Sequence, residues 1–477
     1  MKILLTGSTG FIGHRLLVRL LEEPAVSIRL LVRNARKVSP GLRDRVEVFE
    51  GDVFDPPSLE RAVSGIDVAY YLVHSMSAKD FRERDRLSAT NFRDACIGAA
   101  VKRIIYFGGL GVKESASEHL LSRIEVGEIL SSMPDRIQTL WFRAGVVIGS
   151  GSASFEIMRH LVQKLPVMTT PKWVRTKTQP IAVDDAVSYL TAAKDLAVKG
   201  NLVVDVGTDA MSFGDMMLQT AEVMGLKRYL IPVPMLTPRL SSYWLILMTP
   251  IPFNIAAELI EGLKSETVMQ NDNALRYFPA IRPITLKEAV RRAVEEIIQE
   301  QVVSRWCDSS AGEVCDINYQ ESSLNDAIYK FRKIKTFPPD RAADVFKAIL
   351  TVGGEGGWFR YNILWEIRGI IDKLIGGYGL NRGRRHGTDL RVGDSLDWWK
   401  VVDMRDGKRL LLQSQMKRPC CAWLEFVVEY DSLVITAYFY PRGLGGRLYW
   451  YATLPAHYLI FEDLANSIVK KSEMLSP

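Results

Sequence analysis

Residues 1–13 read MKILLTGSTGFIG, and this stretch decides the fold of the first half of the chain. An apolar run from Ile3 to Leu5 leads into a loop with Gly7, Gly10 and Gly13, and a helical pattern of leucines follows. Glycines fit where a backbone bends sharply and approaches a pyrophosphate, and a helix N-terminus offers free N–H groups to phosphates. The order strand, glycine loop, helix therefore predicts a nucleotide-binding loop, with a purely structural glycine turn as the alternative.

Length and composition limit the class of protein. At 477 residues the chain exceeds what one core usually supports, so we expect two or three domains. The net charge of +6 suits an anionic cofactor and gives no argument for nucleic acid as a partner. Five cysteines do not suggest a disulfide framework, which favours a reducing, cytoplasmic setting.

The apolar stretches are too short to cross a membrane. The first run passes directly into the glycine loop, unlike a signal peptide. The longest, Tyr243 to Phe253, contains Pro250 and Pro252 and falls short of the ~20 residues that a spanning helix needs. The wider segment from Tyr229 to Phe253 has three possible fates: core packing, the lining of an apolar substrate pocket, or peripheral contact with a membrane surface.

Strand and helix patterns alternate after the glycine loop, which is typical of a doubly wound parallel α/β sheet. Further strands are predicted at residues 28–33, 46–49, 68–73, 103–107 and 139–147. Ligands bind at the carboxyl ends of such strands. His74 and Gly108 follow the fourth and fifth strands, so we expect them near the nicotinamide ring of a bound dinucleotide.

The residues after the second strand indicate which dinucleotide binds. A carboxylate at this position binds the ribose hydroxyl of NAD, whereas an arginine accommodates the 2′-phosphate of NADP. Here Arg33 is followed by Arg36 and Lys37 with no acid nearby, which favours NADP(H) over NAD(H), unless these are ordinary solvated charges. Asp52 and Val53 follow the third strand and are expected to contact the adenine, a plain turn being the alternative. The predicted cofactor contacts are Gly7, Ser8, Thr9, Gly10, Phe11, Ile12, Gly13, Arg33, Asn34, Asp52, Val53, Val73, His74 and Gly108.

Several stretches resemble the extended and atypical branches of the short-chain dehydrogenase/reductase superfamily. They are TGSTGFIG (6–13), GDVFD (51–55) and RAGVVIGSGSASFE (143–156). Three later stretches, at 176–190, 243–252 and 446–457, are similar to an atypical subgroup whose C-terminal domain has no known function, the DUF2867 type. The resemblance implies an NAD(P)-binding Rossmann domain and carbonyl or hydroxyl chemistry.

The catalytic part of the superfamily pattern is altered. The resemblance implies a Tyr-x-x-x-Lys pair on a helix, where residues four apart share a face. His119 and Arg123 occupy these positions, and Gly108-Gly109 replaces the usual serine or threonine. Imidazole can act as a general acid or base near neutral pH, whereas arginine does not release its proton. Two interpretations remain open: a rewired acid–base pair, or a lost active site.

The sequence changes character at residues 301–325, which lack periodicity and are predicted to link a domain at 1–300 to one at 326–477. Beyond the linker, alternating apolar residues predict antiparallel strands, with a hairpin turn at Asp406-Gly407, and a helix from about His457 to Lys471. This arrangement resembles the α+β helix-grip fold of polyketide cyclases and START-like domains. Its aromatic residues either line a cavity for an apolar or lipid-like ligand or form an ordinary core.

Two functions follow from these features. One is an NADP(H)-binding oxidoreductase or isomerase that acts on an apolar carbonyl or hydroxyl compound, held partly by the C-terminal domain. The other is a non-catalytic NADP(H)-responsive sensor, regulator or assembly factor. No HExxH, CxxC or clustered carboxylate motif appears in the sequence, so we do not expect a catalytic metal.

Overall fold

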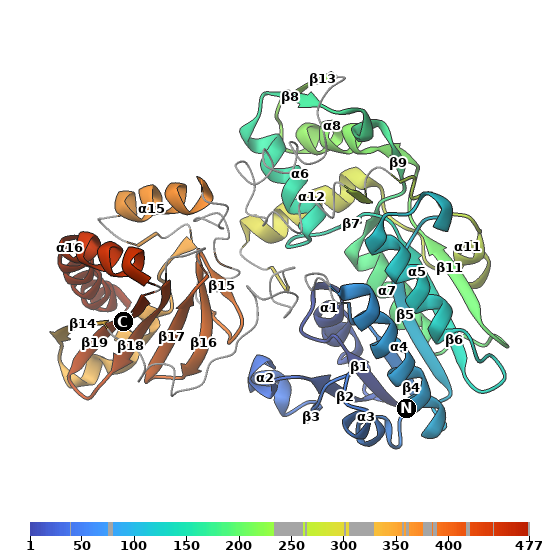
Figure 1. Cartoon of the computed structure of the whole chain (residues 1–477), viewed down its shortest axis with the longest axis horizontal. Coiled ribbons are helices and arrows are strands. Elements are labelled where there is room, and N and C mark those ends of the chain that lie inside the picture. Colours follow the sequence, from blue (N-terminus) through green and yellow to red (C-terminus); the bar gives the residue numbers. More distant parts are fainter. Residues whose placement is uncertain are drawn as a thin grey trace. The chain divides into compact units, whose positions relative to one another are not determined.

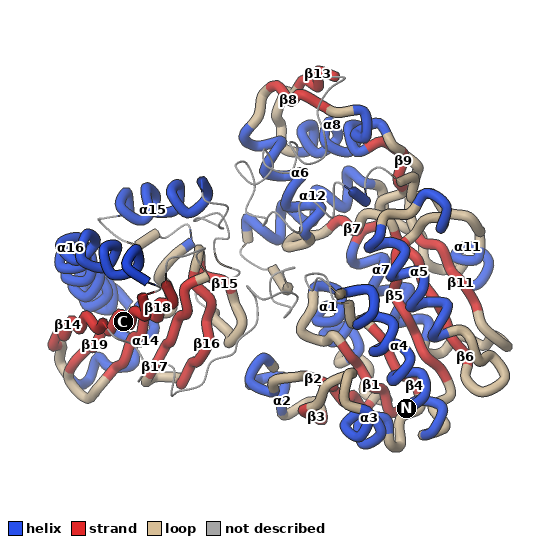
Figure 2. The backbone as a smooth tube through the Cα atoms, in the orientation of Figure 1, coloured by secondary structure: helices blue, strands red, loops and turns tan. Residues whose placement is uncertain are grey.

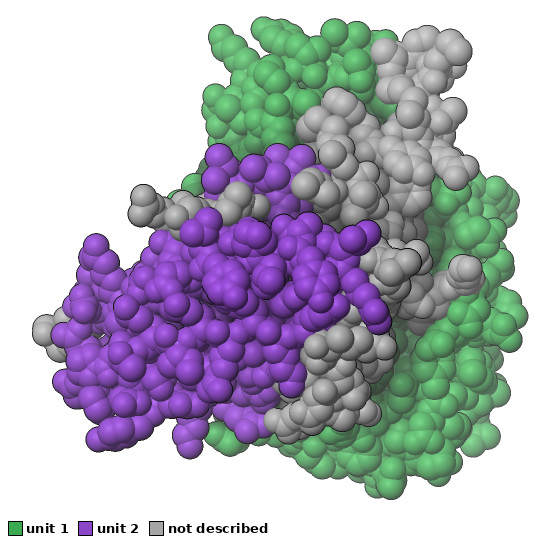
Figure 3. Space-filling model, turned by 60° about the vertical axis from the view of Figure 1, so that its left-hand side comes forward, with its two compact units in different colours: residues 1–313 green, residues 314–477 purple. Residues whose placement is uncertain are grey.

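The computed structural model divides into two compact units, Met1–Glu313 and Val314–Pro477, coloured separately in Figure 3. The structure describes residues 1–38, 40–74, 80–232, 261–262, 265–299, 302–304, 329–354, 357–358, 362–374, 384, 389–415, 420–441 and 443–475. The predicted linker 301–325 lies outside these residues except for 302–304. Of the apolar segment 229–253, only residues 229–232 are described.

Seven strands form one parallel sheet in the first unit, in the order β11-β6-β5-β4-β1-β2-β3 (Figure 1). The strands are β1 (Lys2–Thr6), β2 (Ser27–Val32), β3 (Glu47–Glu50), β4 (Val68–Tyr71), β5 (Arg103–Gly109), β6 (Gln138–Ala144) and β11 (Leu202–Val206). The strand order reverses between β1 and β4, which is the topological switch point of a Rossmann sheet. The prediction of a doubly wound parallel α/β domain is confirmed.

Helices surround this sheet (Figure 2), and each of its faces has its own apolar core. On one face α1 (Phe11–Leu20) packs beside α7 (Val183–Ala193). The other face is covered by α3 (Pro56–Val63), α4 (Phe81–Gly98) and α5 (Glu118–Leu130). Strands between two helix layers must be apolar on both sides, which is why the central strands read as almost continuous apolar runs.

A smaller part of the first unit packs around a third core formed by α6 (Ala153–Lys164), α8 (Phe213–Val223) and α12 (Leu286–Ile298). Its short strands are β7 (Val147–Ile148), β8 (Val167–Thr170), β9 (Lys177–Thr178), β10 (Ile181–Ala182), β12 (Met211–Ser212) and β13 (Tyr229–Pro232), and two short helices of the unit are α2 (Pro40–Arg43) and α11 (Asn273–Tyr277). Buried Arg15 of α1 donates hydrogen bonds to Glu296 of α12 and to the Ser150 hydroxyl, both at 2.8 Å. These bonds connect the smaller part to helix α1, which follows the glycine loop.

The second unit contains an antiparallel sheet of six strands, in the order β14-β19-β18-β17-β16-β15 (Figure 1). The strands are β14 (Tyr329–Thr336), β15 (Ser395–Leu396), β16 (Trp399–Arg405), β17 (Arg409–Ser414), β18 (Cys420–Val428) and β19 (Ser432–Pro441), and the helices are α14 (Ala342–Ile349), α15 (Asn362–Leu374) and α16 (Gly443–Leu475). The hairpin predicted at Asp406-Gly407 is confirmed, and Gly407 adopts a positive φ of 67° there.

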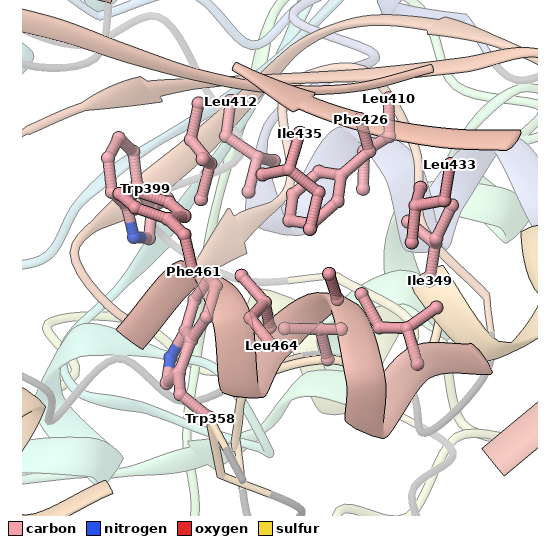
Figure 4. Packing of buried hydrophobic residues seen from close by; sticks show 14 of the residues in the cluster. Ile349, Trp358, Trp399, Leu410, Leu412, Phe426, Leu433, Ile435, Phe461 and Leu464 are labelled. Carbon is pink, nitrogen blue, oxygen red and sulfur yellow. The ribbon is translucent and has the colours of Figure 1, made fainter. Parts of the chain in front are cut away.

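The core of the second unit lies between the sheet and its helices (Figure 4). Leu433 and Ile435 of β19 face this core together with Leu464 of α16. Tyr438, on the opposite face of β19, packs against a small separate cluster that contains Trp423. The alternation predicted for this strand is therefore confirmed, and it gives the sheet one face that is covered by α14 and α16.

The predicted start of the terminal helix, near His457, was wrong. The helix α16 begins at Gly443 and runs for 33 residues, with Pro455 inside it. Because proline normally interrupts a helix, a continuous helix through Pro455 is not predictable from the local pattern. At this length α16 extends for about 50 Å and packs along α14, β19 and β14. None of the helices in the described part of the chain combines the length and apolar character required to cross a membrane.

Candidate functional site

The glycine loop follows β1 at the carboxyl edge of the parallel sheet. Gly7 has a φ of +70°, and a Cβ atom placed on it would lie 2.4 Å from the carbonyl oxygen of Leu72. A Cβ on Gly13 would lie 2.1 Å from the oxygen of Gly7. Side chains at either position would push the loop away from β4 or from α1, so the tight turn depends on both glycines.

The loop suits a phosphate-bearing cofactor. Helix α1 starts at Phe11 with Gly10 as its N-cap, and no side chain caps its first turn. Ser8 is 2% exposed, and its hydroxyl has no hydrogen-bond partner among the residues that the structure describes. A buried hydroxyl without a partner beside an uncapped helix N-terminus matches the donors that a pyrophosphate requires.

Thr6 connects the two strands that flank the switch point. Its hydroxyl donates to the Tyr70 carbonyl oxygen at 2.9 Å and accepts from the Leu72 amide at 3.2 Å. The glycine loop after β1 is thereby held next to the segment after β4, which contains Val73 and His74. The glycine loop and this segment lie at the same edge of the sheet, where doubly wound sheets bind their ligands.

The predicted contacts for the adenine half of the cofactor lie farther along this edge. Exposed Arg33 and half-buried Asn34 follow β2 directly. Asp52 follows β3, where its carboxylate accepts from the Phe54 amide at 3.1 Å. Val53 is 7% exposed and belongs to the core under α3 and α4.

Half-buried His74 forms a hydrogen-bonded set with two buried residues from the helices. Its Nδ1 atom lies 2.7 Å from Oδ2 of Asp85 on α4, and the same oxygen accepts from the Ser122 hydroxyl of α5 at 2.9 Å. Asp85 is 2% exposed and Ser122 1%. Because a carboxylate only accepts hydrogen bonds, Nδ1 carries the imidazole proton and Nε2 is left as the basic nitrogen.

The charge state of His74 follows from its surroundings. Burial lowers the pKa of this imidazole, and the nearby Arg123 guanidinium lowers it further. The hydrogen bond to Asp85 acts in the opposite direction and raises the pKa, but the net shift is downward. His74 is therefore neutral at physiological pH and available to accept a proton.

His119 and Arg123, which the sequence resemblance predicts as the catalytic pair, lie beside this set. Helix α5 begins after Ser117, whose hydroxyl caps it by accepting from the Leu120 amide. The His119 ring stacks on Phe81 at 4.1 Å and lies 6.3 Å from the His74 ring, centroid to centroid. The Arg123 side chain passes the end of β5, where a Cβ on Gly109 would lie 3.3 Å from its Cδ atom.

Gly108 leaves no room for a hydroxyl-bearing side chain at the end of β5. A Cβ there would lie 2.8 Å from the Trp141 indole nitrogen and 2.8 Å from the Tyr106 ring. A Cβ placed on Gly127 of α5 would lie 2.3 Å from the same indole ring. The bulky Trp141 thus fills the space beside Gly108, the position at which the sequence resemblance implies a serine or threonine. In the described residues no three His, Cys, Asp or Glu side chains gather as a metal site.

Two family models match separate parts of the chain. Residues 7–133 match the family described as "NAD(P)H-binding", and residues 324–464 match "Protein of unknown function (DUF2867)". The chain joins an NAD(P)H-binding domain to a DUF2867 domain. Both domains are those that the sequence resemblance indicated, whereas the likeness of the second one to START-like folds stays a prediction.

Known relatives of the NAD(P)H-binding domain include reductases and epimerases. A UDP-glucose 4-epimerase of Vibrio cholerae is 24% identical over 264 residues, which is 49% of this chain and 79% of that protein. The NADP(H) complex of Citrobacter sp. triphenylmethane reductase has a TM-score of 0.51 at 20% identity. A Staphylococcus aureus nucleoside-diphosphate-sugar epimerase has a TM-score of 0.50 at 17% identity. Each of these two structures matches 61% of this chain and is itself covered completely, a likeness of fold.

Asp85 and Ser122 are the members of the NAD(P)H-binding domain's site that sequence reasoning missed. Asp85 stands in the charged run FRERDRL (81–87), which looks like a solvated helix surface. Yet the buried residues of α4 recur at helical spacing from Asp85 through Ser88, Ala89 and Phe92. This spacing places the carboxylate on the inner face of the helix, and it is the signal from which Asp85 can be found.

Proposed function

We propose that the chain is an NADP(H)-dependent oxidoreductase or isomerase that acts on an apolar carbonyl or hydroxyl compound. The observation that carries this proposal is the position of the pair formed by half-buried His74 and buried Asp85 at the edge that also bears the glycine loop. A protein that only binds a nucleotide has no need of a hydrogen-bonded imidazole and carboxylate beside it. Perturbed titratable groups in such a place are typical of catalytic sites.

Each residue of the site has a distinct task in this proposal. Bound NADP(H) supplies or takes up a hydride at its nicotinamide ring. The protein must then move the accompanying proton and hold the substrate oxygen. His119 occupies the position of the superfamily's tyrosine, and Arg123, which keeps its charge, orients the cofactor or the substrate oxygen.

The proposed preference for NADP(H) rests on the segment after β2. Arg33 is exposed at the strand end, Lys37 follows on the next turn, and no acidic residue stands between them. Cationic groups at this position suit a 2′-phosphate, which a carboxylate would repel.

The proposed apolar substrate rests on the interior of the DUF2867 domain. Trp365, Trp398 and Trp399 are each at most 7% exposed, and none of their indole nitrogens has a hydrogen-bond partner in the described part of the chain. Trp365 stands between two other indoles, with its ring centroid 4.7 Å from that of Trp358 and 5.2 Å from that of Trp398. Buried aromatic faces with unpaired N–H donors have the chemistry that suits a hydrophobic compound with an oxygen acceptor.

A non-catalytic NADP(H) sensor is the second candidate, favoured by one observation. Because Trp141 and Tyr106 leave no space for a side chain at Gly108, the hydroxyl that assists the superfamily's tyrosine is absent at this strand end. A sensor retains cofactor binding and loses the need for this group.

Cofactor binding and turnover together test the proposal. Titration calorimetry with NADPH and NADH is run on the wild type, on Arg33→Asp and on a control, Arg136→Asp, which alters an exposed arginine just before β6. We expect Arg33→Asp to weaken NADPH binding by about tenfold or more, the value of a charge-assisted hydrogen bond, and to leave NADH binding nearly unchanged. Equal losses for both cofactors would remove the argument for the 2′-phosphate.

Turnover separates the enzyme from the sensor. NADPH oxidation is followed with phenanthrenequinone and decanal as apolar carbonyl probes, and the alcohol product is identified by mass spectrometry. An enzyme forms product in step with NADPH loss. Tight NADPH binding without product from either probe would favour the sensor.

A further inference from the structure

We infer that His74 is the residue that moves the substrate proton in the proposed reaction, and that Asp85 is its positioning residue. This inference rests on the proposed function and deepens it, because it assigns the proton step to the strand-end imidazole of β4 and not to the helix residue His119. Four features of the described residues carry it: the hydrogen bonding of His74, its place in the sheet, its charged neighbours and the packing of His119.

The hydrogen bonds of His74 fix the ring. Its Nδ1–H group donates to Asp85 over 2.7 Å, and Ser122 donates to the same carboxylate oxygen over 2.9 Å. A buried carboxylate that holds Nδ1–H selects one tautomer and one ring orientation, so the basic Nε2 atom faces away from Asp85. This is the arrangement by which a carboxylate prepares a histidine to act as a general base.

The place of His74 ties it to the cofactor loop. Leu72, two residues earlier, lies against Gly7, and Thr6 bridges the ends of β1 and β4. His74 therefore stands at the switch point of the sheet, where the reactive half of a dinucleotide meets its substrate. Elements of regular structure hold the imidazole there. Strand β4 precedes His74 in the chain, and helices α4 and α5 supply Asp85 and Ser122.

The charged groups around His74 come from both helices that pack against it. Asp85 lies on α4, whereas His119 and Arg123 lie on α5. Burial and the Arg123 charge disfavour the imidazolium, and the Asp85 hydrogen bond favours it. The neutral base is thus the resting form, and the carboxylate is in place to stabilise the cation once a proton arrives.

His119 is held differently. Its ring is stacked on Phe81 at 4.1 Å with an angle of 14° between the planes, and it meets His74 edge-on at 6.3 Å. The stacking contact with Phe81 holds the His119 ring by its face, whereas the Asp85 carboxylate holds the His74 ring at Nδ1. His119 accordingly forms a wall of the site beside the reacting imidazole.

The proton step is written for alcohol oxidation. The substrate O–H bond breaks, and its proton passes to Nε2 of His74, which becomes an imidazolium paired with Asp85. The C–H bond of the carbon that bears the hydroxyl group breaks. Its electron pair leaves with the hydrogen as the hydride that the oxidised cofactor would accept. The carbonyl forms from the remaining electron pair on oxygen. In the reverse direction the imidazolium returns the proton to the oxygen.

A first test reads the histidine tautomer without any turnover. The chain has six histidines, so nitrogen-15 labelling of histidine with two-dimensional nitrogen–proton NMR resolves each ring, and single substitutions assign them. We expect His74 at neutral pH to show Nδ1 protonated and Nε2 bare, to lose this state in Asp85→Asn, and to shift its Nε2 signal when NADP⁺ is added. The His160 signals, from α6, serve as an internal control. A protonated Nε2, or an Nε2 signal that ignores NADP⁺, would overturn the inference.

A second test uses NADPH oxidation with phenanthrenequinone and the reverse oxidation of decanol. We expect His74→Gln to lower kcat by about 100-fold or more, the usual contribution of a general acid–base group, with little change in NADPH affinity. Asp85→Asn should lower kcat in the same direction and shift the pH profile, and Ser122→Ala should do so more weakly. A larger loss in His119→Gln than in His74→Gln would overturn the inference in favour of His119.

Failure of the proposed function has a different signature. A wild-type protein that binds neither cofactor refutes both the proposed function and the role of His74. A wild type that binds NADP⁺ but turns over neither probe favours the sensor over the enzyme, and the NMR signals of His74, which need no turnover, still test whether its imidazole is held as the inference requires.

Discussion

Two regions of the molecule differ in how their polar groups are paired. At the edge of the parallel sheet in the NAD(P)H-binding domain, half-buried His74 and the buried residues Asp85 and Ser122 form a hydrogen-bonded set. In the interior of the DUF2867 domain, the Trp398 and Trp399 indole nitrogens are buried without a hydrogen-bond partner among the described residues. The polar groups of the first set are thus paired, whereas the two indole donors of the second region are unpaired in the described structure.

The difference follows from the two sheet types. Parallel strands leave all their carboxyl ends at one edge, so polar residues from several loops converge there while the sheet faces stay apolar. An antiparallel sheet has no such common edge, and in the DUF2867 domain the aromatic side chains lie in the core on its covered face. Tryptophan brings a polar N–H group into such a core together with a large apolar surface.

The largest expected effect is a loss of cofactor binding in the NAD(P)H-binding domain. Gly13→Val places a side chain where a Cβ already lies 2.1 Å from the Gly7 oxygen, so the loop must open. We expect NADPH affinity, measured by titration calorimetry, to fall by about 100-fold, in line with loss of the aligned phosphate donors. Gly98→Ala in α4 is the control, since nothing lies within 4 Å of its Cβ position. Unchanged NADPH binding in Gly13→Val would show that the loop is a structural turn.

A second change tests whether the two domains are energetically separate. Leu464→Ala removes a side chain that is 1% exposed in the core of Figure 4, and should destabilise the DUF2867 domain by about 3 kcal/mol. Leu459→Ala, on the same helix but 53% exposed, should cost less than about 0.5 kcal/mol. Urea unfolding followed by tryptophan fluorescence measures both, with NADPH affinity determined in parallel. A parallel fall in NADPH affinity would contradict separate stability of the domains.

The smallest expected effect is a loss of stability in acid, which we expect to be similar in the two domains. Burial, aided by Arg368, lowers the pKa of His457 to about 4, and burial, aided by Arg159, does the same for His160 in the first unit. An imidazole in the unfolded chain keeps its usual pKa of 6.5, so the unfolded state binds more protons between pH 6.5 and 4. Each domain is thus fully stabilised above pH 6.5 and should lose about 2 kcal/mol as the pH falls toward 4.5.

Substitution shows which histidine is responsible in each domain. His457→Phe fits among Phe331, Trp450 and Phe461 and should flatten the pH dependence of the DUF2867 transition. His160→Gln should do so for the NAD(P)H-binding domain. Calorimetric melting of both variants at several pH values checks this, and an unaltered slope would assign the acid sensitivity to other groups.

Sequence reasoning reached the features that depend on local pattern. The strand, glycine loop and helix at the N-terminus, the parallel strands and the hairpin at Asp406-Gly407 are each signalled by a few neighbouring residues. It failed where a local rule was outweighed by packing. Pro455 sits within α16 because that helix gains its stability from the sheet and from α14 along its length.

The site itself was reached only in part. Residues at strand ends, such as His74, follow from topology once the strands are known. The partners of His74 do not, because Asp85 and Ser122 lie on two different helices and meet through tertiary packing. Similarly, the sequence shows glycine at position 108 but not that Trp141, 33 residues later, fills the space beside it.

Trp141 also constrains how this site can evolve. Its indole fits because positions 108 and 127 both lack side chains, with Cβ atoms there approaching it to 2.8 and 2.3 Å. A serine at position 108 therefore requires a smaller residue at 141, and a smaller residue at 141 alone leaves a void beside two glycines. Each such single substitution is therefore expected to lower stability. The three positions are coupled sterically, so a change at one of them is tolerated only together with a matching change at another.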